Sequence, residues 1–252
     1  MSNEIFANLQ WLPKPAEDFT SRCKAMVEAA EGAGREAQRL ATSALDENQL
    51  ARLANAIEKV RAKGTPLVPL IPFRLGLLSN STTDFIAPAL VATAARHGIS
   101  LEVIRGGYDQ VLQDALTSDS VVNRSAPDAV LLAIDYRGIP VRGALGNPEK
   151  GREAVNTSLG YLRAVRDALK RNSNAVCIFQ TISAPPETLF GNMDGVHPGS
   201  LLQILDGVNA GIGETVRGST DVVIDLAHLA ATVGLGAWHS PRDWNSAKIP
   251  FS

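Results

Sequence analysis

The sequence has few aromatic residues, few cysteines and little net charge, and each scarcity excludes a class of protein. Aromatic residues make up 5% of the 252 residues, too few for the stacked platforms on which single-stranded nucleic acids lie. Lys and Arg total 24 against 26 Asp and Glu, a net charge of −2, so no basic field favours nucleic acid or an anionic membrane. Cys23 and Cys177 form neither a disulfide framework nor a C-x-x-C zinc pair.

Long apolar runs are also missing. No stretch approaches the roughly 18 apolar residues of a membrane-spanning helix, and the N-terminal MSNEIFANLQWLPKP lacks the basic and apolar segments of a signal peptide. We expect a soluble, cytoplasmic protein whose partner is a small molecule or another protein. No cluster of metal-ligating residues is visible, so neither a metal nor a cofactor is expected.

What is present is an aliphatic chain with two kinds of pattern. Residues 1–65 are predicted to form a helical N-terminal extension, because apolar residues recur at helical spacing over 16–31 and 35–63 and Gly64 follows as a stop. Residues 66–252 are predicted to form the main α/β domain. The extension either caps that domain or docks a partner.

From Arg74 onward, strand and helix patterns alternate five times. The predicted strands are RLGLLS, SLEVI, PDAVLLAID, NAVCIFQTIS and TDVVIDL. Their continuous apolar runs indicate strands buried on both faces, hence a five-stranded parallel sheet between helices. In such sheets the ligand lies at the carboxyl ends of the strands. This directs attention to the loops after Leu78, Ile134, Ile182 and Leu226.

Three familiar motifs are absent on closer inspection. Gly146–Gly151 has the glycine spacing of a phosphate-binding loop but lacks its Lys and Ser/Thr, so we interpret it as a turn that leads a helix. The sequence GAGREA at 32–37 imitates a dinucleotide fingerprint but follows no strand. No G-x-S-x-G elbow occurs, which argues against an ordinary α/β-hydrolase.

The loop that leaves the first strand, Ser79-Asn80-Ser81-Thr82-Thr83-Asp84, is the strongest candidate site. One of its hydroxyls could act as a nucleophile beside free N–H groups of the next helix. The alternative is that Thr83 or Asp84 only caps that helix.

A nucleophile needs a base, and three histidines compete for that role. His197 follows Asp194 by three residues, a spacing at which the carboxylate could orient the imidazole. His228 follows Asp225 in the same way, although Asp225 could instead cap a helix. His239 lies in the last loop with no carboxylate partner at that spacing.

The chain resembles the SGNH, or GDSL-type, hydrolase superfamily, through its serine-bearing loop, its PDAVLLAID strand and its D-G-x-H-P segment. LQWLPKPAEDF, LLSNSTTDFIAPAL, YDQVLQDAL, PDAVLLAIDYR and AWHSPRDWNSAKIPFS resemble, more specifically, the N-terminal half of FkbH-like proteins. The resemblance implies a three-layer flavodoxin-like fold. In FkbH-like proteins this half precedes a haloacid-dehalogenase-type domain that loads glyceryl units onto carrier proteins in polyketide assembly. The chain ends where that domain would begin, so we do not expect glyceryl loading from this chain alone.

The same resemblance suggests roles for individual residues. Ser81 would be the nucleophile, with Ser79 and Thr82, which FkbH-like chains often share, as the alternatives. His239 or His197, the latter with Asp194, would be the base. Arg137 stands where the superfamily has an oxyanion-binding Asn, and its guanidinium could hold a carboxylate or phosphate. The residues implied for substrate or oxyanion binding are Ser79, Asn80, Thr82, Gly106, Gly107 and Arg137.

Two functions follow from this. The first is a serine-dependent hydrolase or acyltransferase that acts on a small or acyl-carrier-bound ester in polyketide-type metabolism. The second is a non-catalytic module that docks an acyl carrier protein or partner enzyme. Docking predicts that the cations of the extension gather on one face, since carrier proteins are acidic. These cations are Arg35, Arg39, Arg52, Lys59, Arg61 and Lys63. Of the two tryptophans near the end, Trp238 and Trp244, each could line a substrate mouth or pin the C-terminal tail.

Overall fold

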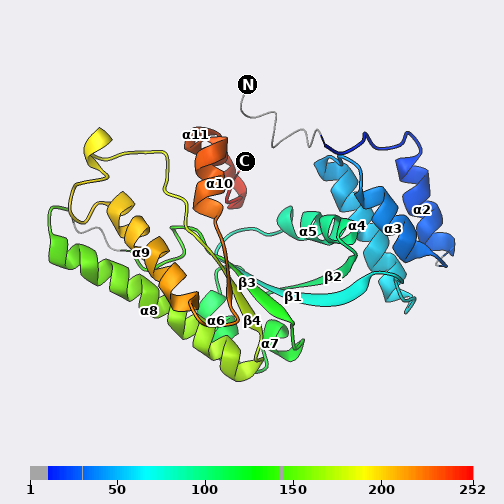
Figure 1. Cartoon of the computed structure of the whole chain (residues 1–252), viewed down its shortest axis with the longest axis horizontal. Coiled ribbons are helices and arrows are strands. Elements are labelled where there is room, and N and C mark those ends of the chain that lie inside the picture. Colours follow the sequence, from blue (N-terminus) through cyan, green and yellow to red (C-terminus); the bar gives the residue numbers. More distant parts are fainter. Residues whose placement is uncertain (1–10, 30, 142–144, 252) are drawn as a thin grey trace. The chain divides into compact units, whose positions relative to one another are not determined.

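The computed structural model describes residues 11–29, 31–141 and 145–251. The chain forms two compact units (Figure 1). One contains the residues up to Leu75 together with Thr83–Val103, and the other contains Gly76–Thr82 and the chain from Ile104 onward. The division expected at residues 65 and 66 stays a prediction.

A five-stranded sheet runs through the chain in the order β2-β1-β3-β4-β5. Its strands are β1 (Ile71–Ser79), β2 (Ile99–Arg105), β3 (Ala129–Ala133), β4 (Val176–Gln180) and β5 (Val222–Ile224). The β3–β4 and β4–β5 pairs are parallel, with Val130 opposite Cys177 and Phe179 opposite Val223. This strand order is that of flavodoxin-like sheets, and the predicted α/β fold with an all-parallel sheet is confirmed.

The helices account for most of the remaining described chain. They are α2 (Phe19–Ala29), α3 (Ala33–Ala41), α4 (Glu47–Ala62), α5 (Ile86–Arg96), α6 (Val111–Leu116), α7 (Val121–Arg124), α8 (Pro148–Asn172), α9 (Leu201–Val216), α10 (Leu226–Val233), α11 (Leu235–Trp238) and α12 (Pro241–Ala247), with a 3₁₀ turn, η1, at Gly191–Met193. Helical structure within 16–63 is confirmed, but the helix expected over 35–63 is two helices.

Each unit has its own apolar core. In the unit that begins the chain, α2, α3 and α4 bury Phe19, Leu40, Leu53 and Ile57 in one core, and α3 and α4 pack against α5. The other unit buries one side of α8 and α9 with the inner residues of β3 and β4. In that unit α8 packs along α9 (Figure 1). No helix within the described ranges is long and apolar enough to cross a membrane.

Capping side chains fix several helix starts. Asp46 begins α4 with a reciprocal capping box to Gln49, which explains why the predicted long helix is interrupted. Asn147 caps α8 by accepting from two backbone N–H groups, with Pro148 in the first turn, so the Gly146–Gly151 segment does lead a helix. Asp225 caps α10 by accepting from the His228 N–H. The prediction that Asp225 caps a helix, instead of orienting His228 as a base, is therefore confirmed. The N-cap of α5 is Phe85, and not Thr83 or Asp84.

Candidate functional site

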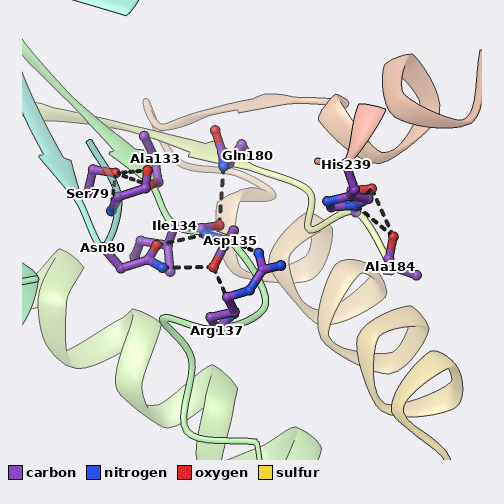
Figure 2. Close-up of polar contacts among 11 residues, drawn as sticks. Ser79, Asn80, Ala133, Ile134, Asp135, Arg137, Gln180, Ala184 and His239 are labelled. Carbon is purple, nitrogen blue, oxygen red and sulfur yellow. Dashed lines mark hydrogen bonds and ion pairs between the residues drawn. The ribbon is translucent and has the colours of Figure 1, made fainter. Parts of the chain in front are cut away.

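Polar side chains from three parallel strands meet where β1, β3 and β4 end (Figure 2). Figure 2 shows Ser79 and Asn80 of β1 and its loop on one side and His239 with Ala184 on the other. Asp135 and Arg137, from the loop after β3, lie between them. The position is the one that a parallel sheet predicts for a ligand site.

The two serines of the β1 loop hydrogen-bond to each other. Ser79 and Ser81 are each 4% exposed, and their Oγ atoms are 2.8 Å apart. Ser79 Oγ donates to the Ala133 carbonyl and accepts from the Ser81 N–H. Because Ser79 has a single hydroxyl proton, Ser81 must be the donor in the Oγ–Oγ bond. The Ser81 proton therefore points to a hydroxyl that is not a base.

Asn80 joins the β1 loop to the β3 loop through a two-way contact. Its Nδ2 donates to Asp135 Oδ1 at 2.7 Å, and its Oδ1 accepts from the Asp135 N–H at 2.9 Å. A Cβ at Gly138 would lie 2.5 Å from the Asn80 Cγ, so glycine is needed for this close approach. Asn80 is buried, and its amide positions Asp135. The substrate-binding role implied for Asn80 by the resemblance stays a prediction.

Arg137 is the cationic centre of the site. Its Nη1 donates to Asp135 Oδ2 at 2.7 Å, and its guanidinium lies over two rings, 4.2 Å from the centre of Tyr136 and 4.0 Å from that of Trp244. The Lys248 Nζ lies 5.5 Å from the same Trp244 ring. The Arg137 side chain stays 26% exposed. A guanidinium that lies over two rings and stays partly exposed suits a carboxylate or phosphate.

His239 is buried and makes its hydrogen bonds to the loop after β4. Its Nε2 lies 3.0 Å from the Ala184 carbonyl and 3.3 Å from Ser183 Oγ. A carbonyl only accepts, so Nε2 carries the proton, and the free lone pair is on Nδ1. Burial lowers the pKa of His239, and the positive charge of Arg137 lowers it further. Both effects favour the neutral form of the ring.

The second predicted base belongs to a different part of this unit. The Asp194 carboxylate accepts from the Leu189 and Phe190 N–H groups, and it therefore orders the loop around η1. His197 packs its ring against Phe190 at 4.3 Å. Within the described residues, Asp194 and His197 share no side-chain hydrogen bond, so the carboxylate does not orient the imidazole.

The remaining predicted residues make structural contacts. Thr82 donates from Oγ1 to the Ala247 carbonyl and from its N–H to the Lys248 carbonyl, tying the C-terminal segment to the β1 loop. The Gly106 N–H donates to Leu77, and the Gly107 N–H donates to the Asp114 carboxylate. Both amides proposed for an oxyanion are thus already bonded.

Sequence reasoning missed Asp135 and Tyr136 and left the role of Trp244 open. Asp135 ends the PDAVLLAID strand pattern, so its position could have been noticed, but its pairing with Asn80 is visible only in the fold. The Trp238 ring lies 4.9 Å from the Phe251 ring, centre to centre, and Trp238 is 9% exposed, so it holds the C-terminal tail in place. The Trp244 ring instead contacts the Arg137 guanidinium. Throughout the described ranges, no group of three or more His, Cys, Asp or Glu could hold a metal ion.

One solved structure supports the fold, and a second match is weaker. The N-terminal part of the protein BF1531 from Bacteroides fragilis, which contains a phosphatase domain complexed with Mg, superposes with a TM-score of 0.66 at 15% identity. The match covers 82% of this chain and 52% of that one, so this chain spans about half the length of that structure. A cobalamin-binding protein from Desulfitobacterium hafniense DCB-2 matches at 12% identity with a TM-score of 0.31, covering 81% of this chain and 100% of that one.

Among curated proteins nothing matches significantly. The family model described as "FkbH, N-terminal domain" matches residues 74–252. That span starts in β1 and includes the whole site around Arg137. The chain therefore belongs to the family of FkbH N-terminal domains.

Proposed function

We propose that this FkbH N-terminal domain is a binding module that holds the acid group of a small or carrier-bound acyl unit on Arg137. The observation that carries the proposal is the Arg137 guanidinium, which pairs with Asp135 and lies over the Tyr136 and Trp244 rings with part of its side chain exposed. One of its five N–H groups is used by Asp135, and Lys248 adds a second positive charge beside Trp244. A bidentate carboxylate or phosphate contact fits this arrangement.

The hydrogen bonds of the site favour binding over acyl cleavage. Ser81 donates its proton to Ser79, which in turn donates to a peptide carbonyl. His239 uses its Nε2 proton on Ala184. A serine nucleophile needs a base within hydrogen-bond reach, and among the described residues neither His239 nor His197 has a hydrogen bond to Ser81. Hydrolase or acyltransferase activity at Ser81 stays the competing prediction.

The acyl unit and its carrier are also part of the proposal. Family membership supports a place in polyketide-type metabolism, as the resemblance to FkbH-like proteins implies. An acyl carrier protein or a free small ester would deliver the acid group.

A binding experiment tests the role of Arg137. We would titrate the protein with glycerate, phosphoglycerate and glycerol by calorimetry, using Arg137→Gln and a control, Arg163→Gln, which alters an exposed arginine on α8. We expect the acids to bind, glycerol not to bind, and Arg137→Gln to weaken binding by about 10- to 100-fold because a charged hydrogen bond contributes about 1.5–3 kcal/mol. Equal affinities of Arg137→Gln and the wild type would contradict the proposal.

A fluorophosphonate probe separates binding from serine catalysis. We expect no adduct on the folded wild-type chain by intact mass. An adduct that Ser81→Ala abolishes and Thr82→Ala retains would establish an activated serine and overturn the non-catalytic proposal. Replacing His239 or His197 by Ala would then identify the base.

A further inference from the structure

A groove lies between α2 and α4, in the unit that begins the chain and apart from the Arg137 site. Its volume is about 460 Å³. The α2 residues that line it are spaced as one helical face, and so are those of α4. The floor is formed by Cys23 and Ala56, both buried, with Val27 half-buried beside them. Burial raises the pKa of the Cys23 thiol, so the floor is neutral and apolar.

The rim of the groove is positive. Three exposed cations line it, Lys24 from α2 and Arg52 and Lys59 from α4, against one carboxylate, Glu28. The remaining polar lining residues are neutral: Thr20, Asn48 and Asn55. An apolar floor between two helices with a cationic rim complements a helix that is apolar on one face and acidic on its flanks.

Three other cations of this helical region make contacts of their own. Arg39 pairs with Glu36, and Arg61 donates to the Leu101 carbonyl. Lys63 donates to the Val27 carbonyl at the end of α2. Of the six cations named from the sequence, Arg52 and Lys59 are the two that line the groove.

We propose that the α2–α4 groove is a docking site for an acidic amphipathic helix of a partner protein. Small side chains make room for the helix, because Ala51 and Ala56 stand where α4 faces the groove. The apolar stripe of the partner would cover Val27 and the floor, and its carboxylates would face Lys24, Arg52 and Lys59. The proposal is independent of ligand binding at Arg137.

The test uses the full chain and a synthetic helical peptide of about 20 residues, with leucines on one face and glutamates on its flanks. A control peptide has the same composition with the leucines distributed over all faces. Affinities are measured by fluorescence anisotropy for the wild type, for Arg52→Glu/Lys59→Glu, and for Ala51→Phe, which fills the groove without changing charge. Arg35→Glu, which reverses an exposed cation outside the groove lining, is the matched control variant.

The expected result is binding of the amphipathic peptide that weakens as salt rises. The double charge reversal and Ala51→Phe should each weaken it by at least about tenfold, with Arg35→Glu unchanged and all variants equally folded by circular dichroism. Absence of binding, equal binding of the control peptide, or equal binding by the charge-reversed variant would overturn the proposal. Displacement of the peptide by inorganic pyrophosphate would instead indicate a small-anion site. A wild-type dimer that Ala51→Phe dissociates would indicate a second copy as the occupant.

Discussion

Asn80 determines where the loop after β3 can place Arg137. Its amide satisfies both the Asp135 N–H and Asp135 Oδ1, and Asp135 in turn accepts from the Arg137 N–H and its guanidinium. A single buried amide thus sets the orientation of the cation that we assign to the ligand. Removing the amide leaves Asp135 with unmet hydrogen bonds.

Asn80→Ala should lower the free energy of unfolding by about 1–3 kcal/mol, the cost of leaving a buried polar group unsatisfied. Chemical denaturation measures the change. Asn156→Ala, at an exposed position on α8, serves as the control and should change stability by less than about 0.5 kcal/mol. Equal effects of the two substitutions would argue against a positioning role for Asn80.

His239 should make stability depend on pH. Burial lowers its pKa below the unfolded value, which is about 6.5. The unfolded chain therefore takes up protons first as the pH falls, and the stability that neutral His239 contributes is present above pH 6.5 and lost below it. We expect the midpoint of urea unfolding to fall between about pH 7 and pH 5. His239→Gln should flatten that dependence, and an unchanged profile would mean that other groups cause it.

The site could be located from the sequence, but its contacts could not. Polar residues after buried strands placed Ser79, Asn80 and Arg137 at the carboxyl edge, because that edge follows from the apolar pattern alone. Which of them touch depends on packing: Arg137 and Trp244 meet although they are far apart in sequence. The Ser81 and His239 roles came from resemblance and stay predictions.

At the scale of elements, the positions of the strands were predicted well because unbroken apolar runs are typical of parallel strands. Burial on both faces was wrong for β5, where Val222 and Ile224 are exposed. Helix ends were predicted less well. The sequence does contain a local signal for the start of α4, because Asp46 is followed three residues later by Gln49, as in a capping box. The helical spacing of the apolar residues continues past this point, so it predicted one helix instead of two. The short helices α10, α11 and α12 lack a long amphipathic pattern, so periodicity gave no sign of them.

Asp221 links α8, β4 and the start of β5 in the unit that contains the chain from Ile104 onward. Its fully buried carboxylate accepts from Arg166 and Lys170 of α8 and from the Cys177 N–H of β4, just before β5 begins. Burial would raise the pKa of Asp221, but the hydrogen bonds from Lys170, Cys177 and Arg166 outweigh it and lower the pKa. Its contribution is present above the unfolded pKa of about 3.9 and is lost as the pH falls through the folded value.

Asp221→Asn should destabilise the protein by about 3 kcal/mol, because it leaves two cations beside a buried neutral group. Asp167→Asn is the matched control, since Asp167 lies 3.9 Å from the same Arg166 but is 66% exposed, and exposed pairs contribute less than about 1 kcal/mol. Thermal and urea unfolding at pH 7 measure both. The difference between the variants should shrink at pH values below about 4, where Asp221 of the unfolded chain takes up a proton while the folded carboxylate is still charged.

At the scale of the whole molecule, β1 belongs to both units. Residues up to Leu75 belong to one unit and the rest of the strand to the other. The same holds for β2, which the division crosses between Val103 and Ile104. A domain boundary usually falls in an exposed linker, where the chain can be cut without exposing buried residues. Here the boundary crosses two strands, so a cut nearby exposes apolar residues that are buried in the intact chain. This bears on whether residues 66–252 form a domain by themselves.

The fragment 66–252 should be unstable by itself. In the intact chain, α5 buries Val91, Ala92 and Ala95 in a core whose other members come mostly from α2, α3 and α4. Without residues 1–65 that apolar face of α5 is exposed to water, and exposed apolar patches promote association. We expect the fragment to bind the dye ANS and to lose the sharp thermal transition of the full chain. A monomeric fragment with a sharp transition and no dye binding would instead support an independent α/β domain that begins at residue 66.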